Sequence, residues 1–559
     1  MTTPGSLLLA RRGDARPGLR AGDRTWTWDE VVRESLLRGA VLRRLGLADP
    51  AHVGVLLENT PEHAFWIGGA ALAGGTLVGG NLTRRGDALG GDLRHTDCRA
   101  LVVGPGQRAL LDDVDTGVPA DQVHIVGSDA YAALLDDARA DADAAYDEPW
   151  AAPDPTRPML LLFTSGSTGA PKAVVCSHGR LGTIALRSND SFGLTRDDVA
   201  YISMPMFHGN AIMACWAPAL SVGATVALRE RFSASGWIDD VRRYGATYTT
   251  YVGRALAYVL ATPPGPDDRD NPLRLAFGTE ASARDREAFT ARFDVQILEN
   301  YGSSEGVIAI HRVPGTPDGA LGLPQPRPGA DVAIVDPETG EECPRAVIDA
   351  NGTPTDPACI GELVDRGGAP GFEGYWRNPE ASSERLRDGW YWSGDLGYRD
   401  VDGWFWFAGR SSDWLRVDSE NFAAAPVERI LARSERVLLA AVYGVPDPET
   451  GDQVMAALEL LPGEAFDPDA FAAFLSAQAD LGTKWAPRFI RIVASMPVTG
   501  TNKIDKNPLR RAAWETADPV WWEREKGAGY ARLTPEERTA LRDRFTAAGR
   551  AAFLPPPLT

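Results

Sequence analysis

The stretch 159–174, reading MLLLFTSGSTGAPKAV, constrains the chain most, because an apolar run stops abruptly in a loop of hydroxyl residues and glycines that ends in a lysine. Met159 to Phe163 are continuously apolar, which predicts a strand buried on both faces of an α/β sheet. The next six residues carry no side chain longer than threonine, so backbone N–H groups can approach an anion closely. With the mobile charge of Lys172, the stretch predicts a triphosphate-binding loop.

This loop differs from a Walker A loop. Lys172 follows Pro171 and precedes Ala173, so no hydroxyl stands beside the lysine to hold Mg²⁺. A flexible Ser/Gly linker remains the alternative. The side chains and backbone groups that we expect around the phosphates are those of Thr164, Ser165, Gly166, Ser167, Thr168, Gly169 and Lys172.

Length and composition narrow the possible classes. A chain of 559 residues exceeds what one hydrophobic core usually supports, so we expect a large N-terminal and a smaller C-terminal domain. The formal net charge of −19 argues against a nucleic-acid or anionic-membrane partner. The cysteines form no CxxC pair, which indicates reduced thiols and a cytoplasmic location; they are Cys98, Cys176, Cys215, Cys343 and Cys359.

Two apolar segments could be mistaken for export or membrane signals. Leu7 to Ala10 is too short for the core of a secretory signal. The uncharged run 64–82 holds six glycines, so we expect a helix, a glycine break and a strand there, and no membrane span.

Strand-like and helix-like runs alternate through the first 150 residues, as in doubly wound α/β sheets. The expected strands are Val53–Leu57, Leu101–Val103 and His124–Val126, and the expected helices are Trp28–Leu45 and Glu62–Ala73. The segment 141–155, rich in acidic residues, alanine and proline, is expected to be an exposed connector.

Further candidate site segments follow. Leu275–Ala281 and Gln296–Gly306 each run from an apolar strand into a turn of small residues, where open α/β sheets bind ligands. Tryptophans alternate on both sides of the turn at Asp402 and Gly403, which predicts a hairpin.

Six motifs in a fixed order over residues 160–506 resemble those of the adenylate-forming superfamily of acyl-CoA synthetases, luciferases and peptide-synthetase adenylation domains. They include TSGSTGAPK, MPMFHGNA, QILENYGSSEG, the SGD and AGR segments and PVTGTNKIDKN. The chain is most similar to the branch of fatty-acid-CoA ligases and fatty-acid transport proteins. The resemblance implies an N-terminal domain (1–411) of doubly wound sheets plus a distorted β-barrel, a hinge at 411–413, and a small mobile α+β lid (412–559).

By motif position, the resemblance also assigns roles. Tyr301 would lie near adenine, Ser304 at the α-phosphate and Glu305 on Mg²⁺. Lys503 would reach the reacting groups from the lid, with Lys506 as a solvated neighbour. Asp395 and Arg410 would bind the ribose, and His208 would lie at the mouth of the acid pocket. Further nucleotide-binding candidates are Gly278, Thr279, Glu280, Asn300 and Gly302; further candidates for the acid pocket are Tyr248, Tyr251, Gly253, Arg254 and Tyr258, with Gly278 again.

The implied reaction joins a fatty or aryl carboxylate to AMP, releases pyrophosphate and transfers the acyl group to CoA, with ATP and Mg²⁺ required. One departure bears on the second step: Ser419, in VDSEN, stands where related CoA ligases have glycine beside the pantetheine tunnel, with Asn421 nearby. Two alternatives stay open, an ATP-dependent diazotase that activates nitrite for an aryl amine, and a non-catalytic nucleotide-binding protein. The expected partner is a small acid, and the assembly a monomer or homodimer.

Because the pantetheine arm would pass Ser419, we predict that Ser419→Gly leaves pyrophosphate release unchanged and speeds thioester formation. Single-turnover assays of the two half-reactions measure this. Rapid thioester formation by the wild type that the glycine does not alter would make Ser419 a neutral substitution.

Overall fold

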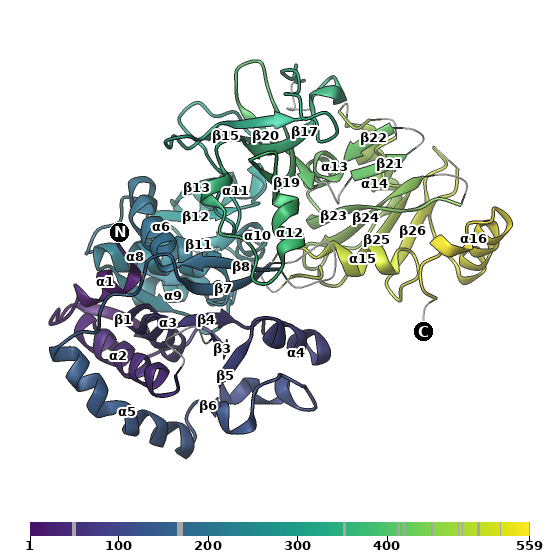
Figure 1. The fold of residues 1–559 in the computed structure, drawn as a ribbon. Coiled ribbons are helices and arrows are strands. Elements are labelled where there is room, and N and C mark those ends of the chain that lie inside the picture. Colours follow the sequence, from purple (N-terminus) through teal and green to yellow (C-terminus); the bar gives the residue numbers. More distant parts are fainter. Residues whose placement is uncertain are drawn as a thin grey trace.

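The computed structural model describes residues 1–46, 52–164, 172–349, 354–410, 414–417, 420–448, 451–478, 480–482, 484–499, 503–525 and 527–557. Within these ranges the chain forms two large sheets flanked by helices, followed by a C-terminal five-stranded sheet (Figure 1). The C-terminal sheet, yellow-green in Figure 1, lies at one end of the molecule and the blue N-terminal strands at another.

The first sheet has the strand order β6-β5-β3-β4-β7-β8. Its strands are β3 (His52–Leu56), β4 (Thr76–Gly79), β5 (Cys98–Val103), β6 (Val123–Ile125), β7 (Pro158–Thr164) and β8 (Lys172–Ser177). All pairs are parallel except β7 with β8. The helices around it include α2 (Trp28–Arg44), α3 (Pro61–Ala73), α4 (Gly86–His95) and α5 (Asp129–Asp147). The predicted alternation of strands and helices is confirmed.

The second sheet joins a parallel and an antiparallel part in one path. The parallel part holds β1 (Pro17–Ala21), β10 (Thr225–Leu228), β9 (Val199–Ile202), β11 (Tyr248–Val252), β12 (Leu275–Thr279) and β13 (Gln296–Gly302), with β2 (Arg24–Thr27) antiparallel at its edge. The antiparallel part continues through β14 (Ala309–His311), β15 (Ala320–Pro324), β20 (Phe405–Arg410), β19 (Trp390–Arg399), β17 (Gly361–Asp365) and β16 (Val332–Val335), with β18 (Leu386–Arg387) beside β19. β13 joins the two parts, so both border the carboxyl ends of β11 to β13.

The remaining helices of this half are α1 (Pro4–Leu9), α6 (His178–Phe192), α7 (Gly209–Ala211), α8 (Ala217–Val222), α9 (Trp237–Tyr244), α10 (Gly253–Leu260), α11 (Ala283–Phe293) and α12 (Pro379–Arg385). The predicted tryptophan hairpin is the antiparallel pair β19–β20.

One sequence prediction is wrong in part. The first seven residues of the expected connector 141–155 are the last two turns of α5, which ends at Asp147. Ala138, Ala142 and Ala145 form a buried small-residue stripe, and alanine is the strongest helix former. The acidic residues that suggested a loop lie on the solvent face of this helix.

The C-terminal sheet comprises β23 (Val437–Pro446), β24 (Asp452–Leu460), β25 (Phe489–Ile492), β26 (Val520–Glu523) and β27 (Tyr530–Arg532), preceded by the pair β21 (Trp414–Val417) and β22 (Glu420–Ala423). Its helices are α13 (Ala424–Leu431), α14 (Pro468–Ser476), α15 (Lys506–Ala512) and α16 (Pro535–Ala547). All five cysteines are free, and four of them are buried. In the described ranges no helix has the length and apolar character to cross a bilayer.

The tail after residue 515 is part of this fold. Phe545 of α16 is fully buried and its ring lies 5.8 Å from that of Trp514, which stacks on Phe489 at 5.4 Å. The helix begins at a capping box formed by Thr534 and Glu537. The tail therefore completes the C-terminal core.

We predict that Phe545→Ala lowers the free energy of unfolding of this region by about 3–5 kcal/mol, because it opens a cavity in a packed aromatic cluster. Phe553, which is 56% exposed, supplies the matched control, and Phe553→Ala should change stability by about 0.5 kcal/mol or less. Urea unfolding followed by circular dichroism compares the two, and equal destabilisation would contradict the assigned packing.

Candidate active site

A cavity of about 910 Å³ lies where the two parts of the second sheet meet the C-terminal region. Its wall includes the ends of β12 and β13, the turn 303–305, the C-terminal end of α12 and residues 393–395 of β19, and Lys503 closes it from the C-terminal region. Many predicted site residues share this wall: Lys172, Thr279, Glu280, Asn300, Tyr301, Gly302, Ser304, Glu305, Asp395 and Lys503. Motifs more than 300 residues apart in sequence thus meet in one cavity.

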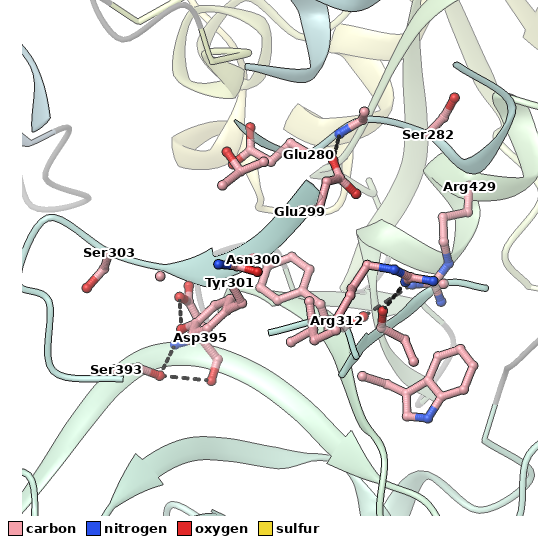
Figure 2. A pocket seen from close by; sticks show the side chains of 18 of the residues that line it. Glu280, Ser282, Glu299, Asn300, Tyr301, Ser303, Arg312, Ser393, Asp395 and Arg429 are labelled. Carbon is pink, nitrogen blue, oxygen red and sulfur yellow. Dashed lines mark hydrogen bonds between the residues drawn. The ribbon is translucent and has the colours of Figure 1, made fainter. Parts of the chain in front are cut away.

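A tyrosine–aspartate pair lies on one side of this cavity. The Tyr301 hydroxyl donates a 2.6 Å hydrogen bond to Asp395 Oδ2, and the Asp395 backbone N–H donates to Ser393 Oγ at 3.1 Å (Figure 2). Asp395 is also the register partner of Arg410 across β19 and β20. The carboxylate is therefore held in place beside an aromatic ring, as a site for a ribose diol next to a base requires.

Glu305 is a buried carboxylate on the same wall. It is 7% exposed and accepts a 2.6 Å hydrogen bond from the Tyr375 hydroxyl at Oε1. Burial opposes its charge, but the hydrogen bond from Tyr375, its own backbone N–H and the nearby charge of Arg385 outweigh this effect and hold the pKa of Glu305 below its usual range. It is thus an ionised oxygen ligand in a nucleotide-sized cavity.

This donor set fits magnesium held together with a substrate. Mg²⁺ in nucleotide enzymes uses one or two carboxylates and takes its other ligands from phosphates and water. Across the part of the chain that the structure describes, no group of three or more His, Cys, Asp or Glu side chains could hold a metal. As a buried, ionised carboxylate, Glu305 could supply a protein ligand, with the polyphosphate and water supplying others.

Lys172 begins β8, opposite Thr164 at the end of β7. Its side chain is 8% exposed, and its Nζ lies 3.5 Å from Glu384 Oε2 and 5.7 Å from the centre of the Tyr375 ring. The predicted loop joins these two strands, so Lys172 stands at its end as expected. The lysine, Tyr375 and Glu305 form one charged cluster at this end of the cavity.

Lys503 enters the cavity from the C-terminal region. Its Nζ lies 2.7 Å from Oε1 of Glu280. The backbone of Glu280 has φ +68°, a left-handed conformation that is uncommon for a residue other than glycine. The expectation that Lys506 is a solvated neighbour is wrong: Lys506 is 14% exposed and pairs with Glu428 at 2.8 Å.

Beside the cavity, neighbouring strands bring together the residues predicted for the acid pocket. Gly278 on β12 is the register partner of both Tyr251 and Glu299, and a Cβ at Gly278 would meet the Tyr251 ring at 2.6 Å. The Tyr251 hydroxyl donates to Glu299 Oε1 at 3.2 Å, and Glu299 pairs with Arg286 at 2.8 Å. Gly278 and Tyr251 thus support the cavity wall from behind it.

His208 precedes α7, is 6% exposed, and its ring lies 4.3 Å from that of Phe207. The next residue, Gly209, brings this motif beside Ser304 Oγ, which lies 3.7 Å from the Cβ position at Gly209. The motif with His208 and the turn that carries Ser304 are therefore neighbours.

Two predicted pocket tyrosines lie elsewhere. Tyr248 is fully buried and donates to the Ala214 carbonyl at 2.6 Å. Tyr258 donates to the Glu459 carboxylate at 3.0 Å and so ties α10 to the C-terminal sheet. The resemblance made them candidates through the position of their segment, but Tyr248 begins the buried strand β11 and Tyr258 lies in the second turn of α10.

For several predicted positions the structure describes either no part of the residue or no side chain. The residues 165–169, the hinge 411–413 and Ser419 lie outside the described ranges, and nothing is described for the side chains of Thr164, Arg254, Arg410 and Asn421. Gly253 begins α10.

The sequence predictions missed part of the wall: Glu299, Arg312, Tyr375, Glu384, Arg385 and Arg429. A signal was present for three of them, because Tyr375 lies within the recognisable segment GFEGYWRNPEAS and Glu384 and Arg385 follow it closely. Glu299 could have been found as a carboxylate inside the otherwise apolar start of QILENYG.

We predict that Tyr375→Phe moves the acidic limb of the pH–activity profile to higher pH. Removing the hydroxyl removes the hydrogen bond that favours ionised Glu305, so the pKa of Glu305 rises and more of it is protonated at a given acidic pH. Tyr530→Phe, which removes a hydroxyl bound to the Pro487 carbonyl far from the cavity, should leave the profile unchanged. An unmoved or downward-shifted limb in Tyr375→Phe would contradict this coupling.

With this geometry established, comparison with known proteins gives consistent matches. Residues 9–376 match the family model described as AMP-binding enzyme, and residues 426–503 match the AMP-binding enzyme C-terminal domain. The chain is 50% identical over 557 residues to a steroid-22-oyl-CoA synthetase of Rhodococcus jostii, covering 99% of each chain. It is 45% identical over 506 residues to a medium/long-chain-fatty-acid–CoA ligase, FadD17, of Mycobacterium tuberculosis, covering 90% and 95%.

Solved structures share the fold. A crystal structure of the anthranilate CoA ligase AuaEII with anthranoyl-AMP has a TM-score of 0.78 at 24% identity, covering 92% of this chain and 97% of that one. A benzoate CoA ligase from Burkholderia xenovorans has a TM-score of 0.75 at 23% identity, covering 91% and 100%. The comparisons support acyl-CoA ligation and give no support to the diazotase or non-catalytic alternatives.

Proposed function

We propose a substrate class for this chain, which belongs to the AMP-binding enzyme family and is an adenylate-forming acyl-CoA ligase. The substrate is a lipophilic carboxylic acid, either a steroid side-chain acid or a medium- to long-chain fatty acid. The assignment to lipophilic acids rests on the 50% identity to a steroid-22-oyl-CoA synthetase over 99% of both chains.

The cavity supports the first half-reaction. The acid's carboxylate attacks the α-phosphorus of ATP, the bond to the bridging oxygen breaks, and pyrophosphate leaves with the electron pair. Asp395 and Tyr301 orient the nucleoside, and Lys503 offsets the negative charge of the two reacting anions. Mg²⁺ bound by Glu305 would neutralise charge on the polyphosphate. A protein nucleophile is not needed.

In the second half-reaction the CoA thiolate attacks the acyl carbon and AMP leaves. We propose that the unit 412–559 turns about residues 411–413 between the two steps, because Lys503 occupies the cavity mouth during the first. The five free cysteines are in keeping with a reducing, cytoplasmic setting.

The test is a panel of acids assayed for pyrophosphate release and then for thioester. Steroid acids with a carboxylated side chain and fatty acids of graded length should give the highest kcat/KM, and benzoate and anthranilate the lowest. Preference for the aryl acids would overturn the assignment to lipophilic acids. Absence of pyrophosphate release with every carboxylic acid would overturn the ligase activity.

We predict that Lys503→Ala lowers kcat for pyrophosphate release about 100-fold or more, while ATP still binds, because the lysine acts mainly on charge that develops in the transition state. Lys506→Ala is the matched control from the same segment, since Lys506 pairs with Glu428 away from the cavity. Equal rates in wild type and Lys503→Ala would refute the assigned role.

A further inference from the structure

Arg385 is a cation of the cavity wall that none of the motif assignments includes. It is the last residue of α12 and lines the cavity together with Lys172, Glu305 and Asp395. Its side chain is half-buried. Most arginines of the described chain form an ion pair with a carboxylate. Arg385 forms no ion pair with any carboxylate that the structure describes.

The contacts of Arg385 fix the guanidinium without using all its donors. Nε donates to the Tyr375 hydroxyl at 3.3 Å and Nη1 to the Trp392 carbonyl at 3.4 Å. A guanidinium has five N–H donors, so further donors are available to a ligand. The group also lies against the backbone of Gly394, where any side chain would collide with Nη1. Glycine at this position therefore makes room for the guanidinium beside residues 393–395 of β19.

Tyr375 links Arg385 to the metal and phosphate end of the cavity. Its hydroxyl accepts from Arg385 Nε and donates to Glu305 Oε1 at 2.6 Å, while Lys172 Nζ lies 5.7 Å from its ring centre. One tyrosine thus has Lys172 over its ring, and Arg385 and the buried Glu305 at its hydroxyl. Lys172 is also paired with the more exposed Glu384 at 3.5 Å. The two cations and Glu305 suit a polyphosphate with its metal, because planar guanidinium matches phosphate oxygens in pairs.

We propose that Arg385 is a second cationic ligand of the ATP polyphosphate, contacting the β- and γ-phosphates and holding the pyrophosphate as it leaves. This rests on the proposed function for its chemistry. The placement follows from Tyr375, which joins Arg385 to Glu305, the candidate metal ligand, and lies beside Lys172. This side of the cavity would receive the phosphates beyond the α-phosphate. Arg385 would then not contact AMP.

The test compares three titrations, with MgATP, with magnesium pyrophosphate and with AMP, in wild type, Arg385→Gln and Arg385→Lys. The glutamine variant should bind MgATP and pyrophosphate about tenfold more weakly or worse, as expected for the loss of a charged hydrogen bond, and bind AMP within about twofold of wild type. Lysine, which keeps the charge but not the paired donors, should lose less.

Arg387→Gln is the matched control. Arg387 lies two residues further on, pairs with Glu362 at 3.1 Å and stacks on Trp392 at 3.8 Å, away from the cavity wall. It should leave all three affinities unchanged. If Arg385→Gln weakens the binding of AMP and of ATP equally, Arg385 has a structural role. If it changes neither affinity, Arg385 does not touch the nucleotide. Either result overturns the proposal.

The same titrations distinguish a failure of the Arg385 proposal from a failure of the proposed function. If the wild type binds MgATP and pyrophosphate while no acid elicits pyrophosphate release, the proposed substrate class fails and the Arg385 comparison still stands. If the wild type binds neither MgATP nor pyrophosphate, the Arg385 proposal falls.

Discussion

The ion pair between Lys503 and Glu280 is the contact on which the completed cavity depends. It brings a side chain of the C-terminal region within 2.7 Å of a carboxylate at the end of β12. Neighbouring contacts support the same arrangement: Tyr258 binds Glu459 at 3.0 Å, and Arg284 donates to the Ser434 carbonyl at 2.9 Å. Without this contact the cavity wall would lack Lys503. The substrate carboxylate and the ATP phosphates would then meet with less positive charge to offset their repulsion.

The remaining wall is organised by charge before any substrate arrives. Lys172, Glu305 and Arg385 surround Tyr375, and Asp395 is fixed by Tyr301 and Ser393. Groups held in this way need little reorganisation when charge moves during the reaction, which is the source of most electrostatic catalysis. The parallel strands β11 to β13 supply the rigid base, because their carboxyl ends meet at one edge.

Local patterns in the sequence were sufficient for the strands and for the hairpin β19–β20, because strand ends and turns follow from apolar runs and glycines. Most of the residues that meet in the cavity were predicted from the resemblance to the adenylate-forming superfamily, by motif position. Local patterns were insufficient where the outcome depends on tertiary contacts. Tyr258 shares a segment with Tyr251 but contacts Glu459 of the C-terminal sheet, and Lys506 pairs with Glu428, on a helix 78 residues earlier in sequence. Arg385 resembles an ordinary exposed helix residue until the fold places it beside Tyr375.

We propose that this docked arrangement makes an acyl-adenylate by itself, before CoA takes part. The test is exchange of labelled pyrophosphate into ATP, measured with a lipophilic acid and no CoA. We expect exchange that requires the acid and Mg²⁺ and does not require CoA. Exchange that appears only when CoA is present, or none with any acid under conditions where ATP binds, would contradict it.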